Sequence, residues 1–364
     1  MDILKELHSR WSLGKALVRS TVFTGEKLAL PLIEKLATGT VSGKNPLEDP
    51  VLFRKALEEV YQLLKKDGEN IARGFYPREV LKAEGILEHF RRVPKIILDG
   101  YFISRRRKNK NHRDFSKEAQ SYFADVPEYF QRNFHFQSDG YLTKKSAELY
   151  EHQVEILFSG AADAMRRLVI PLLKAKYPGD GEGLRFLELG AGTGRLTKFM
   201  SLAFPKAKII ATDVSSPYLQ KARENLKDFS RVDFLQAMAE EIPLPDGSFD
   251  VVYSCFLFHE LPLEIRKRVL TESFRLLKAG GFFGFVDSIQ KKDAEHFQWA
   301  LARFPVDFHE PFYKNYIEHD MAELLTMAKY DSVQTERGFF SKAMLAEKPV
   351  PRGKTNLKSA PRRS

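Results

Sequence analysis

Three glycines at alternate positions follow a short apolar run. Residues 186–196 read FLELGAGTGRL, so Gly190, Gly192 and Gly194 come directly after a segment with the composition of a buried strand. Glycine packs no side chain and costs backbone entropy, so a cluster of glycines at a strand end needs a geometric reason. Two reasons are available: a tight turn into a helix, or a ligand that lies against bare backbone.

Two acidic residues stand at the ends of neighbouring strand-like runs. Glu188 precedes the first glycine by two positions, and Asp213 closes the next apolar run, IIATD. An acid about 20 residues beyond a glycine loop is placed to accept hydrogen bonds from the hydroxyls of a ribose. The loop does not follow the dinucleotide pattern GxGxxG, because Arg195 stands where the third glycine would be. The alternative is that both acids only cap the helices that follow.

The second half of the chain alternates apolar runs with helical stretches, the pattern of a parallel sheet covered on both faces. The runs that predict strands are 184–189, 207–213, 232–237, 250–258, 280–288 and 339–348. The stretches that predict helices between them are 194–204, 216–227, 263–278 and 312–330. Ligands bind such sheets at the carboxyl ends of the strands, which is where the glycine loop lies.

The first half of the chain is predicted to be α-helical. The stretch 28–39 and an amphipathic segment from about 50 to 66, stopped near Gly68, favour helices separated by a loop over 40–50. Residues 93–102 form a short apolar segment before a basic cluster. Residues 144–178 predict one long helix or two, ending at Pro178.

Three regions are therefore expected. Residues 1–150 form an α-helical N-terminal region that could serve as a lid over a substrate, and its segment 115–141 is dense in aromatic side chains. Residues 151–350 form the ligand-binding domain, with a preceding helix over 151–178 and the sheet core over 183–350. Residues 351–364 are a basic tail expected to be disordered.

The composition limits the kinds of partner and the cellular location that can be expected for this protein. The 364 residues are 43% hydrophobic and carry a formal charge of +10, and much of the basic excess lies in 105–113 and 351–364. A solvated basic loop and tail are the favoured interpretation. A nucleic acid or an anionic membrane surface is the alternative. No run reaches the ~20 apolar residues of a membrane span. The single Cys255 excludes an internal disulfide framework, so a cytoplasmic location is expected, with a peripheral membrane position as the alternative.

The loop and the segments around it resemble a known family. ELGAGTG is similar to the first motif of class I S-adenosylmethionine-dependent methyltransferases. AEEIPLPDGSFDVVYSCFLFHEL resembles the family's segment from the adenine pocket into the fourth strand, and RLLKAGGFFGFVD resembles its fifth strand. The resemblance covers 183–350 and fits the small-molecule, quinone-biosynthesis-like branch best. It implies a Rossmann-like, mostly parallel seven-stranded sheet with helices on both faces, plus the α-helical N-terminal region.

The resemblance implies S-adenosyl-L-methionine as cofactor and S-adenosyl-L-homocysteine as product. The glycines would clear a path for the methionine end of the donor, and Asp213 would hold its ribose. Met238 stands where many members carry Asp, so we expect the backbone of Ala239 to contact the adenine. The residues implied in cofactor binding are Glu188, Gly190, Ala191, Gly192, Gly194, Asp213, Val214, Met238, Ala239, Glu240 and Ser254.

Methyl transfer from a sulfonium is an in-line displacement, in which alignment of donor and acceptor supplies most of the catalysis. A base is needed only if the acceptor must lose a proton. In the family such a group lies at the end of the fourth strand, where this chain carries His259 and Glu260. His259 is the first candidate for a general base and Glu260 the second. The alternative is that both residues only pack and cap the next helix.

The acceptor is expected to be a small aromatic or lipid-like molecule held outside the sheet core. Tyr141 and Tyr150, in the aromatic-dense region, are the candidate substrate contacts. No His, Cys or Asp cluster has the spacing of a metal site, so no metal is expected. Two other functions stay open: an RNA or protein methyltransferase that uses the basic loop 105–113, and a donor-binding regulator without turnover.

Overall fold

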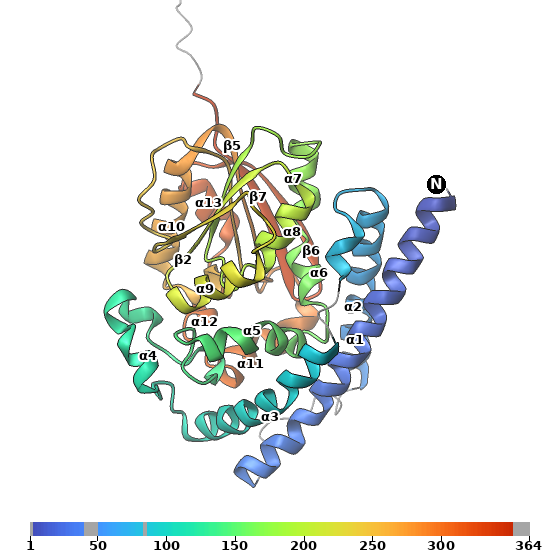
Figure 1. The fold of residues 1–364 in the computed structure, drawn as a ribbon, viewed down its shortest axis with the longest axis vertical. Helices are drawn as coiled ribbons and strands as arrows, with labels where there is room; N and C mark the ends of the chain where they lie inside the picture. Colours follow the sequence, from blue (N-terminus) through green and yellow to red (C-terminus); the bar gives the residue numbers. More distant parts are fainter. Residues whose placement is uncertain (1–2, 40–49, 83–85, 352–364) are drawn as a thin grey trace, which may run out of the picture.

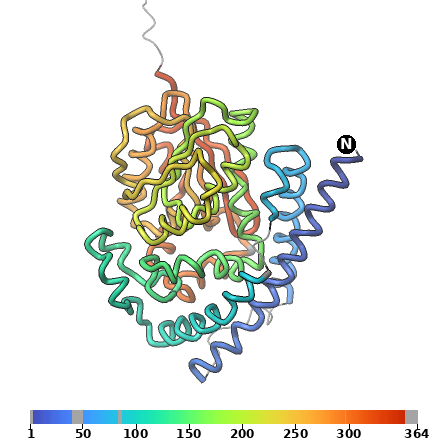
Figure 2. The backbone as a smooth tube through the Cα atoms, in the orientation of Figure 1, coloured from blue at the N-terminus to red at the C-terminus, as the bar shows by residue number. Residues whose placement is uncertain are grey.

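The computed structural model describes residues 3–39, 50–82 and 86–351. Figure 1 shows a sheet domain flanked by a long N-terminal helix and its neighbours. The N-terminal helices are α1 (Ile3–Thr38), α2 (Pro50–Ala72) and α3 (Ile86–Asn109), with a short 3-10 turn over Arg78–Leu81. Figure 2 follows the backbone from these helices through the segment 110–143, which joins α3 to α5. This segment contains α4 (Lys117–Ser121) and short 3-10 turns at Phe123–Asp125, Glu128–Phe130 and Phe134–Phe136.

Seven strands form one sheet in the order β3-β2-β1-β4-β5-β7-β6. Neighbouring strands from β1 to β5 pair in parallel, and β7 pairs antiparallel with β5 and β6. The strands are β1 (Arg185–Leu189), β2 (Lys208–Asp213), β3 (Val232–Gln236), β4 (Phe249–Cys255), β5 (Leu277–Ser288), β6 (Asp331–Gly338) and β7 (Ser341–Glu347). The predicted mostly parallel seven-stranded fold is confirmed. The strand order reverses between β1 and β4, so a ligand crevice is expected there.

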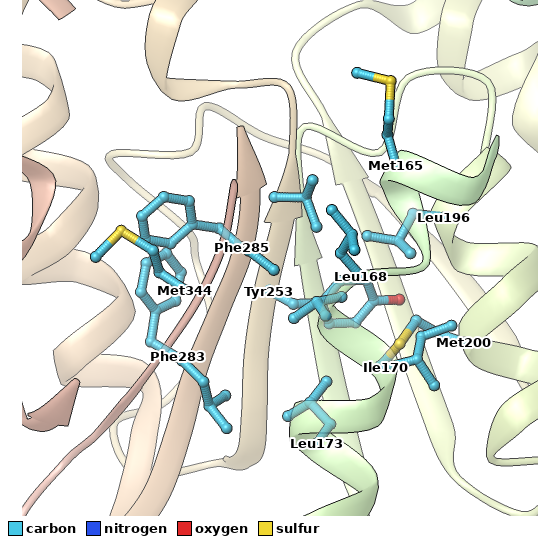
Figure 3. Close-up of a cluster of buried hydrophobic side chains, with 14 of the residues drawn as sticks. Met165, Leu168, Ile170, Leu173, Leu196, Met200, Tyr253, Phe283, Phe285 and Met344 are labelled. Carbon is cyan, nitrogen blue, oxygen red and sulfur yellow. The ribbon is translucent and has the colours of Figure 1, made fainter. Parts of the chain in front are cut away.

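Helices cover both faces of the sheet (Figure 1). They are α5 (Lys144–Leu157), α6 (Ala162–Arg166), α7 (Val169–Lys176), α8 (Arg195–Ala203), α9 (Ser216–Asn225), α10 (Leu263–Leu276), α11 (Gln298–Asp307), α12 (Tyr313–Glu318) and α13 (Met321–Met327). Figure 3 shows the core on both sides of the sheet: Tyr253 of β4 lies toward the side chains of α7 and α8, and Phe283, Phe285 and Met344 lie on the other side. Strands β1, β2 and β4 are almost wholly buried and apolar, which is what burial on both faces requires.

The N-terminal helices are longer than predicted. Helix α1 is continuous from residue 3, and α3 includes both the apolar segment 93–102 and residues 105–109 of the basic cluster. The predicted stop at Gly68 is wrong, because α2 continues to Ala72. A Cβ atom at Gly68 would lie 2.9 Å from the backbone oxygen of Ser9 in α1. Gly68 therefore permits close contact between two helices and does not end one.

Two further predictions of secondary structure are corrected. Residues 144–178 form three helices, because Ser159 and Gly160 adopt positive φ angles of 54° and 77° between α5 and α6. Strand β6 was missed, because its sequence DSVQTERG is polar and it lies at the sheet edge, where only one neighbour pairs with it. The expected boundary after residue 150 falls inside α5.

The basic cluster 105–113 is only partly a solvated loop. Arg106 is buried in the last turn of α3, where its Nε donates to the carbonyl of Phe136 at 2.7 Å. Arg107 pairs with Glu34 of α1 at 2.7 Å. The tail from residue 352 onward lies outside the described residues. Of the helices in the described ranges, none combines the length and apolarity needed to cross a bilayer.

Substitution of Gly68 by Ala should lower the free energy of unfolding by about 1–3 kcal/mol, because the added methyl group displaces the backbone of α1. The matched control is Gly14→Ala in α1, where an added Cβ meets nothing within 4 Å. That change should raise stability by up to about 1 kcal/mol through helix propensity. Urea denaturation of both variants checks this. Equal effects of the two substitutions would contradict the close packing of α1 on α2.

Candidate functional site

The glycine loop connects β1 to α8 at the carboxyl edge of the sheet. All three glycines have positive φ angles, which other residues adopt only with strain. A Cβ at Gly194 would lie 2.6 Å from Leu226 Cδ1, so this glycine lets α8 pack against the end of α9. A Cβ at Gly192 would meet nothing within 4 Å. Both expected reasons for glycine therefore apply, at different positions: Gly194 permits the turn into α8, and Gly192 borders open space where a ligand could lie.

Asp213 lies at the end of β2, beside this loop. Its carboxylate accepts from the backbone N–H of Gly192 at 2.7 Å and of Ser215 at 2.8 Å. Burial raises the pKa of Asp213 to about 6, although these two N–H donors oppose the shift. A carboxylate held by backbone donors at a strand end keeps acceptor capacity for a ligand.

Glu188 occupies a different place from Asp213. It is buried under the loop, where its carboxylate accepts from the hydroxyl of Thr197 in α8. Burial raises the pKa of Glu188 to about 8. Ala191 donates its backbone N–H to the carbonyl of Thr212 at 2.8 Å, which joins the loop to β2. A direct contact between Glu188 and a ligand stays a prediction.

The chain leaving β3 passes the other side of Asp213. Met238 forms a single bridge with Glu241, and Ala239 lies partly buried between them. Glu240 is buried and accepts from the hydroxyl of Tyr129 at 2.9 Å. Val214 packs against a small cluster of Ala119, Val126 and Leu142. The segment before α5 therefore covers this edge of the crevice.

The end of β4 carries the candidate catalytic groups. Ser254 is fully buried, and its hydroxyl has no hydrogen-bond partner among the described residues. Phe256 follows in a left-handed conformation with φ of 53°, a strained geometry that is common at functional sites. His259 Nδ1 lies 2.6 Å from Asp287 Oδ1 at the end of β5. Because a carboxylate accepts, Nδ1 carries the proton, and Nε2 is left to accept.

The neighbouring acid Asp287 affects both the pKa and the orientation of His259. Burial alone would lower the pKa of His259, but the adjacent Asp287 carboxylate outweighs it and the pKa is raised. Asp287 is fully buried and also accepts from the backbone N–H of Phe258 at 2.7 Å. This arrangement fixes the imidazole ring in one orientation.

Tyr141 and Tyr150 come together at this end of the sheet. The Tyr141 hydroxyl donates to Glu260 Oε1 at 2.6 Å, and the Tyr150 ring meets the Tyr141 ring edge-on at 5.7 Å. Burial raises the pKa of both tyrosines well above the usual range. Ser215 donates its hydroxyl to the Tyr141 carbonyl at 2.5 Å, which ties Tyr141 to the loop after β2.

An acidic cluster lies beyond Tyr141. His135 Nε2 is 3.3 Å from Glu310 Oε1 and 3.6 Å from Glu260 Oε1. Glu310 is 1% exposed, and neither of its oxygens has a hydrogen-bond partner among the described residues. Burial raises the pKa of Glu310 well above its usual range, and the charges of Glu260 and Asp287 raise it further. Burial and the two neighbouring acids therefore favour the protonated form of this carboxyl group, which can donate as well as accept.

Among the residues that the structure describes, two groups of side chains have ligand atoms close enough to hold a metal ion. One is His135, Glu260 and Glu310, and the other is Glu26, His89 and His152 in the N-terminal helices. In each group the ligand atoms lie within 4.8 Å of one another. Sequence spacing could not predict either group, because each draws its residues from three separate segments.

A buried charge network anchors the glycine loop to the N-terminal helices. Asp163 of α6 pairs with Arg195, the first residue of α8, and with Arg19 of α1. Burial alone would raise the pKa of Asp163, but Arg195 and Arg19 hold it well below the usual range. Glu151 of α5 accepts from the hydroxyl of Thr193 in the loop at 2.5 Å. The loop is thus held from outside the sheet as well as from within.

A wide surface pocket lies away from this site. It has a volume of about 1300 Å³ and is lined by residues such as Asp180, Ser230 and Arg231. These residues precede β1 or β3, so the pocket lies at the amino ends of the strands. The glycine loop and Asp213 lie at the opposite, carboxyl ends.

Sequence reasoning missed several residues of the site. Asp287 had a usable signal, since it is an acid at a strand end like Asp213. His135 and Glu310 had none, because they lie in turns whose place is decided by packing. Tyr129 lies in the aromatic-dense segment and Glu151 in a stretch expected to be helical, and neither position carries a motif that predicts a function.

Similarity to known proteins agrees with the fold and the loop. Residues 186–281 match a family model described as a methyltransferase domain. Over these residues the chain is similar to a methyltransferase domain, in agreement with its resemblance to the class I S-adenosylmethionine-dependent methyltransferases, whose methyl donor is S-adenosylmethionine.

Individual relatives are similar over part of their length. The ubiquinone/menaquinone biosynthesis C-methyltransferase UbiE of Vibrio vulnificus is 32% identical over 139 residues, which cover 37% of this chain and 51% of that protein. The fatty-acid O-methyltransferase of Mycolicibacterium smegmatis is 29% identical over 178 residues, covering 48% and 58%. A solved methyltransferase structure from Aquifex aeolicus is 24% identical, covers 50% of this chain and 91% of that one, and has a TM-score of 0.37. The chain thus spans about half the length of the curated relatives it matches.

Replacement of Asp163 by Asn should lower the free energy of unfolding by about 3–5 kcal/mol, because the largely buried Arg195 and Arg19 each lose a charged partner. Glu6→Gln is the control, since Glu6 forms an exposed pair with Arg10 on α1 and should change stability by less than about 1 kcal/mol. Urea denaturation at pH 7 measures both. A loss at Asp163 no larger than the control would show that the network does not anchor the loop.

Proposed function

We propose that this protein transfers a methyl group from S-adenosylmethionine to a small, neutral acceptor with aromatic or lipid-like character. One observation carries the proposal. At the β1/β4 reversal of strand order, open space beside Gly192, the carboxylate of Asp213 and the unpartnered hydroxyl of Ser254 lie at adjoining strand ends. This is the part of the fold where α/β sheets bind their ligands.

The residues present suit the donor. Gly192 leaves room for a ligand against the backbone, and Asp213 retains lone pairs for the two ribose hydroxyls. Ser254 offers a buried hydroxyl that a ligand would satisfy. Ala239 and Val214 line the edge on which an adenine ring would lie. We assign the remaining donor contacts to Glu188, Gly190, Ala191, Gly194, Met238 and Glu240.

The chain's own groups would act on the acceptor. The donor, when bound, supplies an electrophilic methyl group on a positively charged sulfur. Tyr141 and the carboxyl groups of Glu260 and Glu310 would orient the acceptor's polar atom. His259, held by Asp287, would accept a proton at Nε2 if the attacking atom carries one. Glu260 is the second candidate for that task. The aromatic side chains over the crevice would exclude water.

The acidic groups of the site favour a neutral acceptor over a carboxylate. The relatives named above act on a quinone precursor and on a fatty acid, both of which combine a polar group with an apolar body. A carboxylate acceptor would add a third acid to the buried pair of Glu260 and Glu310, which disfavours its charged form, whereas the hydroxyl groups of a neutral ring can donate to and accept from this pair. We therefore infer a phenol- or hydroquinone-like acceptor in preference to a fatty acid.

The other candidates are less well supported. Two of the arginines of the basic cluster, Arg106 and Arg107, are engaged within the protein and do not form an open track for RNA. A donor-binding regulator would not need the aligned pair of His259 and Asp287. Methylation of RNA or protein alone, in an assay that also holds the small acceptors, would overturn the proposal.

Donor binding should depend on the ionisation of Asp213. Because burial raises the pKa of Asp213 to about 6, the carboxylate is mostly charged at pH 7 and mostly protonated at pH 5. The dissociation constant of S-adenosylhomocysteine should therefore rise about tenfold as the pH falls from 7 to 5. Isothermal titration calorimetry across this range measures it.

Asp213→Asn is the matched variant for this titration. It should bind at least about tenfold more weakly at pH 7 and lose the pH dependence between 5 and 7. Gly192→Arg, which fills the open space, should abolish binding without unfolding the protein. If both variants bind the donor as tightly as the wild type, the donor binds elsewhere.

Substitution of His259 should lower the rate of methyl transfer without weakening donor binding. His259→Asn should lower kcat by about 10²–10⁴-fold with a phenolic acceptor, while the affinity for S-adenosylhomocysteine changes less than about twofold. Transfer of a labelled methyl group to a panel of hydroquinones, fatty acids and RNA gives kcat and product identity. Glu264→Gln, an exposed change nearby on α10, is the control. An unchanged kcat would leave positioning alone as the source of catalysis.

A further inference from the structure

Helix α1 turns mostly small or polar side chains toward the protein and many large apolar side chains toward solvent, the reverse of the usual arrangement. Its buried residues are Ser12, Ala16, Ser20, Phe23 and Glu34, of which only Phe23 is large and apolar. Its outward side carries eight large apolar residues that are between 47% and 74% exposed, namely Leu4, Leu7, Trp11, Val18, Val22, Leu28, Leu32 and Leu36. A surface helix ordinarily turns its apolar stripe to the core and its polar side to water.

The fold explains the inner side of α1. A Cβ at Gly160 would lie 2.8 Å from Ser20 Cα, and one at Gly68 would lie 2.9 Å from Ser9 O. Backbones this close require small residues, and Ser20 also donates its hydroxyl to the carbonyl of Ser159 at 2.7 Å. No contact of this kind explains why the outer side is apolar.

The exposed apolar residues form one continuous stripe along α1. Most follow one another at steps of three or four residues, which places them on one side of a helix. Gly14 and Gly25 fall on the same side, and a Cβ on either would meet nothing within 4 Å. From Leu4 to Leu36 the stripe is on the order of 50 Å long. Exposed apolar surface of this extent marks a binding face.

The charges beside the stripe are of one sign. In the described span of α1 the fully exposed charged residues are Lys5, Arg10, Lys15 and Lys35. The acids of the helix are engaged: Glu6 with Arg10, Glu26 with His89 and His152, and Glu34 with Arg107. Lys15 and Arg78 lie over the ring of Trp11.

Helix α3, which packs beside α1, repeats this composition. Its exposed apolar residues are Leu87, Phe90, Ile97, Leu98 and Phe102. Its exposed basic residues are Arg91, Lys95, Arg105 and Lys108, against one exposed acid, Glu88. Two adjacent helices thus present apolar and basic groups together.

We propose that the outward face of α1, with the exposed residues of α3, docks on the surface of an anionic lipid bilayer. Apolar side chains would enter the boundary between headgroups and acyl chains, and the flanking lysines and arginines would contact lipid phosphates. A second copy of this chain suits the face less well, because pairing α1 with itself would bring like charges together. The proposal does not depend on the methyltransferase activity, although Glu26 of α1 bonds to His152 of α5, the helix that carries Tyr150.

Vesicle binding of the full chain tests the proposal. A Trp299→Phe background leaves Trp11 as the only tryptophan, since the chain has two. Vesicles of phosphatidylglycerol and phosphatidylcholine should shift the Trp11 emission to the blue and carry the protein into the pellet. Phosphatidylcholine vesicles alone should bind at least about tenfold less protein, and added salt should weaken anionic binding.

Three double variants test which face binds the vesicles. Leu7→Gln with Val18→Gln should weaken binding to anionic vesicles at least about tenfold. Val306→Gln with Met327→Gln, which removes equally exposed apolar groups from α11 and α13, should change it less than twofold. Lys5→Gln with Lys15→Gln should reduce the preference for anionic over neutral vesicles. Unchanged S-adenosylhomocysteine affinity and melting temperature in each variant would show that the fold is intact.

Two results would overturn the proposal. One is the absence of vesicle binding by the wild-type chain at low salt. The other is a dimer in sedimentation velocity that the Leu7/Val18 variant dissociates, because the face would then be covered by a second copy. Vesicle binding that the Val306/Met327 variant loses to the same degree would also contradict the assignment to α1.

Discussion

A buried acid holds this structure together at the point where its two halves meet. Asp163 pairs with Arg19 from α1 and Arg195 from α8, and Arg166 of its own helix lies within 3.2 Å. Removal of charges from water is costly, and only close pairing within the protein offsets it. The first residue after the glycine loop is therefore tied to the N-terminal helix, so the position of the glycine loop depends on residues nearly 180 positions apart in sequence.

The segment 115–151 and the carboxyl edge of the sheet complete each other's polar contacts. Tyr141 donates to Glu260 beyond β4, Tyr129 donates to Glu240 beyond β3, and Thr193 of the loop donates to Glu151 of α5. Each bond joins a residue of segment 115–151 to a different connection at the carboxyl edge. An opening of this segment would leave several buried polar groups unpaired at once, so the segment moves as a unit or stays closed.

The proposed lipid face and the proposed catalytic crevice meet through α5. This helix contacts α1 on one side and α9 on the other, and it carries Tyr150 between them. An acceptor with an apolar body would partition into a membrane, and a membrane-bound enzyme would find it there at high local concentration. Small residues such as Ser20 on the inner side of α1 allow its backbone to approach the end of α5, while most of its large apolar side chains lie on the outer side.

The sequence by itself determined the parallel strands, the glycine loop and the place of Asp213. These features are local: buried strands read as continuous apolar runs, and glycine with an acid at a strand end marks a turn that meets a ligand. The tertiary structure alone decided the length of α1 and α3, the polar edge strand β6, and the meeting of His135, Glu260 and Glu310. Gly68 shows why, since the same residue type signals a helix end or a close helix contact, and only the neighbouring helix distinguishes them. Edge pairing, close packing and clusters drawn from distant turns depend on contacts that no local pattern encodes.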